Sequence, residues 1–341
     1  MPGESNSFWW LREVHVTTKV SMPLTPVQER LFGIFHPYAA TQQAAVFSNG
    51  IRFVYYTRAE TAMRIIKNKQ IWMRKSMCMN DFSEVQHGLD CLYATYRGEV
   101  GNRFRSVLDR LFDGLRSEIE QLFDGWTGHL RWDSYLTCVS EHKVEEDMLG
   151  RLSMWRAYGG TNGVALVMNN AAFQATEPSD VLKIYASPVA YFDKKKFEEK
   201  FAEVVNNLEK EVDFLKEQGR EEIKGRLFRM LAFAVLCTKH PGFKEEAEWR
   251  VIHCPWWENS PHLLKETELI QGVPQPVYKI ALEDIPEKGL FGITISALID
   301  RIIIGPTRDP LAMAEGFRDL LAHAGVEQPN KIHISYIPLR Q

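Results

Sequence analysis

The chain has 341 residues, of which 45% are hydrophobic and 25% are charged, and its formal net charge is −3. A charge this close to zero excludes the broad basic surface that grips duplex nucleic acid or an acidic membrane. The longest apolar run, over residues 230–237, is far shorter than the roughly 20 residues of a membrane span. The cysteines include no Cys-x-x-Cys pair, and the N-terminus shows no secretory signal. We therefore expect a cytoplasmic protein with reduced thiols, no bound metal and no association with a membrane.

The first 50 residues are predicted to form a helical arm. The segment Thr25–Gln28 has the pattern of a capping box, in which Thr and Gln side chains satisfy the free amides of a helix start. The alternating run over residues 51–57 then predicts the first strand of the body. A second capping-box pattern, Thr57–Glu60, predicts that a helix starts directly after this strand.

Strands and helices follow one another irregularly along the rest of the chain. Alternating or short buried apolar runs predict strands, and apolar residues three and four apart predict helices. The predicted strands span residues 71–73, 134–140, 163–168, 187–192, 245–254, 277–283, 298–305 and 331–337. The predicted helices span residues 81–96, 102–125, 147–158, 193–238 and 310–324. We expect an α+β fold with a mixed sheet, in which residues 51–341 form one domain with helical insertions near 81–130 and 193–238.

Two carboxylates and an arginine alternate in the predicted strand over residues 245–254. Because neighbouring side chains of a strand point to opposite faces, Glu246, Glu248 and Arg250 would share one face. One interpretation is a solvated face whose Glu–Arg pair contributes less than about 1 kcal/mol. The other is a catalytic carboxylate that the arginine holds in place. The spacing alone leaves both interpretations open.

The end of the first predicted strand is a second candidate site. Tyr55 and Tyr56 lie in this strand, and Thr57 and Arg58 lead into the following helix. Free backbone amides at a helix start favour anions, so this place suits a diphosphate, with Arg58 in the first turn. The alternative is that both tyrosines are ordinary strand aromatics and that Thr57 only caps the helix.

Two further segments complete the set of candidates. Asn80 and Asp81 precede a predicted helix. They are candidates for binding, and the alternative is that one of them only caps this helix. Trp155 is expected in the core of the protein. Tyr158 stands at the end of the same predicted helix, beside two glycines, where its hydroxyl can reach a cleft.

In this order, the segments resemble a bacterial family described as a domain of unknown function. Its motifs are Tyr/His-x-Thr at a strand end, Asn-Asp-x-x-Glu, Met-Trp-x-x-Tyr-Gly, Glu-x-Glu-Trp-Arg and a late Ile-x-x-Ile-Ile-x-Gly strand. In this chain the motifs lie at Tyr55–Thr57, Asn80–Glu84, Met154–Gly159, Glu246–Arg250 and Ile299–Gly305. More distantly, the opening and closing motifs are similar to those of ADP-ribosyltransferases, which carry a histidine on the first strand and a glutamate on a late strand.

The resemblance to ADP-ribosyltransferases implies a role for each candidate residue. Tyr55 takes the place of the histidine, Glu248 that of the catalytic glutamate, and Glu246 the first place of a Glu-x-Glu pair. Tyr158 matches a tyrosine or serine that the family carries on a central strand. The residues implied in NAD binding are Tyr55, Tyr56, Thr57, Arg58, Asn80, Asp81 and Trp155.

The implied function is transfer of ADP-ribose from NAD to a nucleic acid or a protein, as in a toxin or an antiviral-defence effector. Cleavage of the nicotinamide–ribose bond builds positive charge on the ribose, which a carboxylate such as Glu248 stabilises. Two alternatives stay open. One is a non-catalytic binding module in which the same residues form a structural polar network, and the other is a metal-dependent nuclease that uses Glu246, Glu248 and Asp81.

Overall fold

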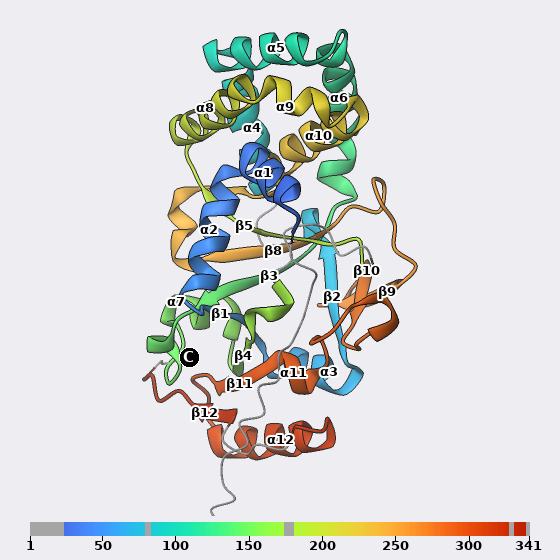
Figure 1. Ribbon diagram of the computed structural model, residues 1–341. Coiled ribbons are helices and arrows are strands. Elements are labelled where there is room, and N and C mark those ends of the chain that lie inside the picture. The colour runs from blue at the N-terminus through green and yellow to red at the C-terminus, as the bar shows by residue number, and fades with distance from the viewer. Residues whose placement is uncertain (1–23, 79–82, 174–180, 327–330, 339–341) are drawn as a thin grey trace, which may run out of the picture.

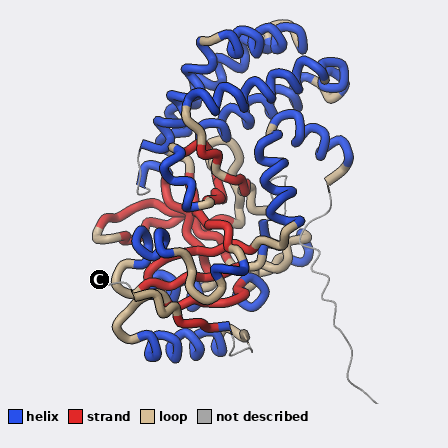
Figure 2. Tube along the Cα trace, turned by 90° about the vertical axis from the view of Figure 1, so that its left-hand side faces the viewer, coloured by secondary structure: helices blue, strands red, loops and turns tan. Residues whose placement is uncertain are grey.

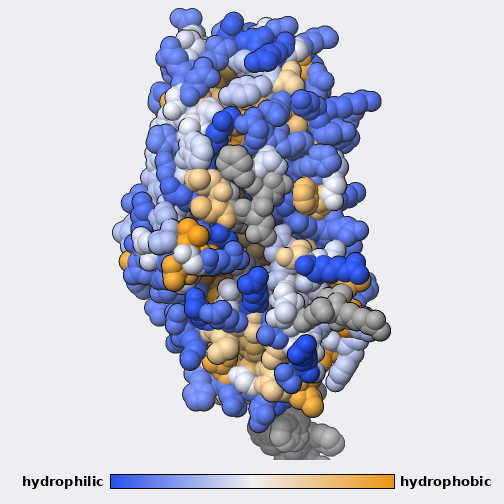
Figure 3. Space-filling model, turned by 180° about the vertical axis from the view of Figure 1, so that it is seen from behind, coloured by the Kyte–Doolittle hydropathy of each residue, from blue (hydrophilic) through white to orange (hydrophobic). Residues whose placement is uncertain are grey.

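Helices gather at one end of the elongated molecule and strands fill its middle (Figure 1, Figure 2). The computed structural model describes residues 24–78, 83–173, 181–326 and 331–338. Within these residues, no helix is both long enough and apolar enough to cross a lipid bilayer. The face seen from behind is mainly hydrophilic, with small hydrophobic patches (Figure 3).

A mixed sheet forms the middle of the molecule, as predicted. Its strands in the described residues are β1 (Arg52–Arg58), β2 (Gln70–Lys75), β3 (Tyr135–His142), β4 (Gly163–Met168), β5 (Tyr185–Pro188), β8 (Glu248–His253), β9 (Leu263–Ile270), β10 (Val273–Ala281), β11 (Ile299–Ile304) and β12 (Ile332–Ile334). The order is β12-β11-β4-β1-β3-β2-β10-β9, and β8 pairs with both β3 and β5. Strands β11 and β12 are parallel, whereas β1 and its neighbours are antiparallel.

The sheet is split between β1 and β2, which share one edge of β3. Strand β8 pairs with the other edge of β3 over residues 135–140. On the shared edge, β2 pairs near Tyr135 and β1 pairs near Ser140. Strand β1 then follows β4, and β2 follows β10, so two half-sheets diverge from β3. Among the described strands, residues 137–139 pair with neither β1 nor β2, which leaves an opening in the sheet.

The two predicted helical insertions pack together into one bundle, at the upper end of Figure 1. The first insertion forms α4 (Ser83–Arg97), α5 (Glu99–Leu111) and α6 (Leu115–Trp132), and the second forms α8 (Lys194–Lys210), α9 (Val212–Glu217) and α10 (Arg220–Leu236). Their apolar stripes bury one another, because each helix carries hydrophobic residues three and four apart. The single helix predicted over residues 102–125 is interrupted at Gly114, whose φ of 72° favours glycine.

The two predicted capping boxes have different outcomes. In α1 (Pro26–Phe35), the Thr25 side chain accepts from the backbone of Gln28 and the Gln28 side chain accepts from the backbone of Thr25, which confirms the prediction. For the second box, a helix does start directly after the strand, as predicted, but the capping role of Thr57 is wrong. Thr57 still belongs to β1, where it pairs with Val164, and Arg58 is the N-cap of α3 (Ala59–Asn68) without a side-chain cap bond. Pairing with β4 therefore extends the strand past the expected helix start.

Trp155 fills the core on one face of the sheet, and glycines surround its indole. A helix was predicted over residues 147–158, but the chain forms only the short α7 (Leu152–Met154) and a π-helical turn, Trp155–Gly159. A Cβ placed on Gly305 would come within 2.8 Å of the indole, and one on Gly163 within 3.1 Å. The indole therefore occupies space that only glycine leaves free.

Gly150→Ala tests this packing. The new Cβ would lie 2.7 Å from Cζ2 of Trp155, and the backbone φ of 68° also disfavours alanine. We expect a loss of about 2–3 kcal/mol in the free energy of unfolding, measured by urea denaturation. Gly114→Ala is the control, because its φ of 72° is similar and the nearest atom lies 3.8 Å away. Equal losses in the two variants would show that the indole contact contributes nothing.

Candidate functional site

Three glutamates converge on two buried basic side chains where the helical bundle meets the sheet. We call this group the Lys239 cluster. It consists of Glu84 of α4, Lys239 of β7 (Thr238–Lys239), Glu246 of the 3₁₀ helix Pro241–Glu246, and Glu248 and Arg250 of β8.

Lys239 is the centre of the cluster. Its Nζ lies 2.8 Å from Glu84, 2.6 Å from Glu246 and 3.0 Å from Glu248. Nε of Arg250 donates to the second oxygen of Glu248 at 2.8 Å, and its Nη2 donates to the second oxygen of Glu84. The two cations thus hold both oxygens of Glu84 and of Glu248.

Two tyrosines complete the hydrogen bonding of the cluster. The Tyr158 hydroxyl donates to Oε1 of Glu246 at 3.2 Å, while Oε2 of Glu246 accepts from Lys239. The backbone N–H of Glu248 donates to the hydroxyl oxygen of Tyr191 at 2.8 Å. Every oxygen of the three carboxylates therefore has a hydrogen-bond partner, as buried charges require.

Burial and charge act in opposite directions on these groups. Lys239, Glu248 and Arg250 expose 3%, 6% and 2% of their surfaces. Burial raises the pKa of Glu248, but the charges of Arg250 and Lys239 outweigh it and lower this pKa to about 2. Burial raises the pKa of Glu246 above its usual value, although Lys239 acts against it. One carboxylate is thus held firmly ionised, and its neighbour accepts a proton more readily.

The predicted strand face of Glu246, Glu248 and Arg250 is only partly correct. Glu246 does not lie in β8: Ala247, at a φ of 43°, ends the preceding 3₁₀ helix, and the strand begins at Glu248. Glu248 and Arg250 do share a face of β8, while Trp249 packs in the core on the other side. The interpretation as a solvated face is wrong, because both charged side chains are buried.

Tyr55 lies at the opening in the sheet rather than in the Lys239 cluster. Its ring packs against the core on the side of α3. Burial raises the pKa of Tyr55, and the nearby Cys138 thiol also raises it. Burial raises the pKa of Cys138, and the charge of Glu248 raises it further. Cys138 stands on the part of β3 that the split leaves unpaired and is in register with Arg250, whereas Tyr55 packs on the opposite face of the sheet, with Trp249.

Tyr56 and Trp155 form a packed pair, which argues against a role in stacking on a cofactor ring. Their ring centroids are 4.8 Å apart, edge to face, and both side chains are buried. The Tyr56 hydroxyl accepts from the backbone N–H of Arg151 at 2.8 Å. Nε1 of Trp155 donates to the carbonyl of Leu149 at 2.9 Å. Both polar groups are thus used within the protein.

The diphosphate site expected at the start of α3 lacks most of the groups that would bind the anion. The backbone N–H of Ala59, the first of the helix, donates to the carbonyl of Asn162 at 2.8 Å and is not available to an anion. Thr57 is buried in β1. Arg58 is exposed, and its side chain passes over Gly160. Asn80 and Asp81 lie outside the described residues.

Sequence reasoning missed two members of the Lys239 cluster. Glu84 closes the Asn-Asp-x-x-Glu motif but was given no role of its own, whereas its carboxylate binds Lys239 and Arg250. Lys239 carries no local signal except that it follows the apolar end of α10. The motif was informative for Glu84, while only the tertiary structure identifies Lys239.

Tyr158→Phe removes one hydrogen bond of the cluster and keeps the ring. We expect it to cost about 1 kcal/mol of unfolding free energy, because Glu246 loses its neutral donor but keeps Lys239. Chemical denaturation of both proteins at neutral pH measures this. Tyr38→Phe is the control, since that hydroxyl donates to a backbone carbonyl outside the cluster. No measurable loss in Tyr158→Phe would show that Glu246 does not depend on this hydroxyl.

Comparison with known proteins identifies one similarity. Residues 154–251 match the model of a family described as a protein of unknown function, DUF2971. This segment contains Tyr158, Lys239, Glu246, Glu248 and Arg250, so the Lys239 cluster lies in it except for Glu84. The search of curated proteins found no match, and neither did the search of solved structures. In the described part of the chain, no group of three or more His, Cys, Asp or Glu side chains is arranged to hold a metal ion.

Proposed function

We propose that the protein is an ADP-ribosyltransferase-like enzyme that cleaves NAD and transfers ADP-ribose to a macromolecular acceptor. The observation that carries the proposal is the position of Glu248. This ionised carboxylate stands on β8, paired with β3, and Tyr158 donates a hydrogen bond to its neighbour Glu246.

The chemistry divides between the two carboxylates. Glu248, ionised and held by Arg250, would stabilise the positive charge that develops on the ribose as nicotinamide leaves. Glu246, whose raised pKa brings it closer to neutrality, would accept the proton of the attacking acceptor group. The exposed Arg58 would bind the diphosphate of NAD. Tyr55 has no part in this proposal, because its ring packs on the face of the sheet opposite to Glu248. Tyr56 and Trp155 have no part in this proposal.

The test is release of nicotinamide from NAD by the purified full chain, with and without nucleic acid or protein acceptors. Glu248→Gln should reduce release at least about 100-fold, because a neutral amide cannot stabilise the developing charge. Glu268→Gln is the matched control, since Glu268 is one of two carboxylates on another lysine, Lys279. Equal release by the wild type and Glu248→Gln would contradict the proposal.

A non-catalytic binding module is the second candidate, and one observation favours it. All the carboxylate oxygens of the Lys239 cluster already have partners within the protein, as expected of a structural network. In that case Glu248→Gln would lower the melting temperature, NAD would give no thermal shift, and no nicotinamide would appear. A role in a toxin or in antiviral defence follows from the transferase alone and is tested by identifying the modified acceptor.

A further inference from the structure

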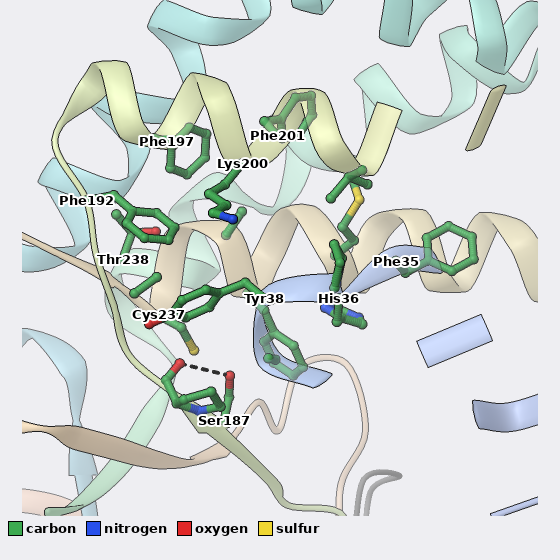
Figure 4. Close-up of a pocket in the computed structure, with 18 residues that line it drawn as sticks. Phe35, His36, Tyr38, Ser187, Phe192, Phe197, Lys200, Phe201, Cys237 and Thr238 are labelled. Atoms are coloured by element: carbon green, nitrogen blue, oxygen red, sulfur yellow. Dashed lines mark hydrogen bonds between the residues drawn. The ribbon is translucent and has the colours of Figure 1, made fainter. Parts of the chain in front are cut away.

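An apolar cavity of about 110 Å³ lies where the helical bundle, the N-terminal helices and the sheet meet (Figure 4). Its wall comes from the turn between α1 and α2 (Pro37–Ser48), from β5, and from one side each of α8 and α10. Aromatic rings make up much of this wall: Phe35, Tyr38, Phe192, Phe197, Phe201 and Phe233. This volume is somewhat smaller than the roughly 150 Å³ of an apolar cavity that binds benzene, so a single ring is the largest ligand that the cavity can hold.

The titratable groups in the wall are neutral or paired. Burial lowers the pKa of His36 to about 3, with Arg229 and Arg226 acting in the same direction, so the imidazole is uncharged. Burial raises the pKa of Cys237 to about 11, which keeps its thiol protonated. The Lys200 ammonium binds Glu203 at 2.7 Å. A charged ligand would lose its hydration here without gaining a counter-charge, so the wall favours an uncharged one.

A thin wall separates the cavity from the Lys239 cluster. Strands β6 (Ala190–Tyr191) and β7 pair in parallel, Ala190 with Thr238 and Tyr191 with Lys239. The first pair, Ala190 and Thr238, lines the cavity. The second pair belongs to the cluster, since Lys239 binds the three glutamates and Tyr191 accepts from the N–H of Glu248. The two pairs are adjacent along the same two strands, so a displacement of the first pair would act directly on the second.

We propose that this cavity binds a small uncharged aromatic molecule and that binding is transmitted through β6 and β7 to the Lys239 cluster. The aromatic wall selects the flat ring, and the lack of an unpaired charge on the lining groups excludes its charged counterparts. The inference concerns binding and its effect on the Lys239 cluster, and it does not depend on the transferase activity.

Benzene and benzoate are the probes, because they share a ring and differ in charge. Benzene at saturating concentration should raise the melting temperature of the full chain by about 2 °C, and benzoate should not. Ala234→Leu, which fills the cavity from α10, should abolish the rise. Ala45→Leu adds the same side chain on the exposed face of α2 and should keep it.

Backbone NMR supplies a second measurement that does not depend on the behaviour of these variants. Benzene should move the amide resonances of Thr238, Lys239 and Glu248, while that of Lys279 on β10 stays in place. A benzene effect that survives in a folded Ala234→Leu protein would place the ligand elsewhere. Fixed resonances at Lys239 and Glu248 would show that the cavity binds without acting on the cluster, and either result would overturn the proposal.

Discussion

Replacing Lys239 with methionine should lower the free energy of unfolding by about 3–5 kcal/mol, because it leaves three buried carboxylates without their shared cation. Methionine has nearly the length of lysine, so the loss reports the charge rather than a cavity. Arg250 would still face Glu84 and Glu248, but Glu246 would keep only its bond from Tyr158. Urea denaturation at neutral pH measures the change.

The pH dependence of this variant separates charge from packing. Lys239 lowers the pKa of Glu246 and of Glu248, so without the ammonium both pKa values rise in the folded state. A carboxyl group with a raised pKa contributes stability at low pH that is lost as the pH increases through that pKa. The Lys239→Met protein should therefore regain more stability than the wild type as the pH falls from 8 towards 5.

Lys279→Met is the matched control for Lys239→Met. Lys279 also binds two carboxylates, of Glu266 and Glu268, but these side chains are 45% and 28% exposed. Water can solvate them after the lysine is removed, so the loss should be about 1 kcal/mol. If both lysine variants lose the same free energy of unfolding, the buried charges of the Lys239 cluster contribute no more to stability than exposed ones do.

Much of the strand and helix pattern could be predicted because it depends on local periodicity. Strand β4 was predicted over residues 163–168, where it occurs, since both faces of this short apolar run are buried. The stripe on α8 likewise predicted a helix that packs on others. Strand β9 was missed because it lies at the edge of the sheet and carries charged side chains with few buried ones. Such a strand forms because it pairs with a neighbour, and its own sequence pattern does not show it.

The candidate site was predictable only where its chemistry lay in one motif. Glu248 and Arg250 alternate along β8, so their shared face followed from the period of a strand. Glu84 and Lys239 reach the same place from two elements that are distant in sequence. The backbone turn at Ala247, which separates Glu246 from the strand, left no trace in the alternation. Convergence of such elements is a property of the tertiary fold.

The wild-type protein should lose stability in acid through Glu248 more than through any other residue of the cluster. Its pKa is about 2 in the folded chain and 4.5 ordinarily, so its contribution is fully present above about pH 5. This contribution is lost as the pH falls towards 2, and it amounts to about 3 kcal/mol. Glu246 acts in the opposite sense, because its raised pKa favours the folded state once it is protonated.

Glu248→Gln isolates this contribution when the slopes of stability against pH are compared rather than the absolute values. The variant leaves two buried cations with one carboxylate fewer, so it is less stable at neutral pH, but it has no proton to bind at this position. Its stability should therefore fall less steeply than that of the wild type between pH 5 and pH 2. Glu268→Gln should keep the wild-type slope, since Glu268 is partly exposed. Parallel curves for the wild type and Glu248→Gln would mean that Arg250 and Lys239 do not hold this carboxylate ionised, and the electrostatic basis of the proposed catalysis would be lost with it.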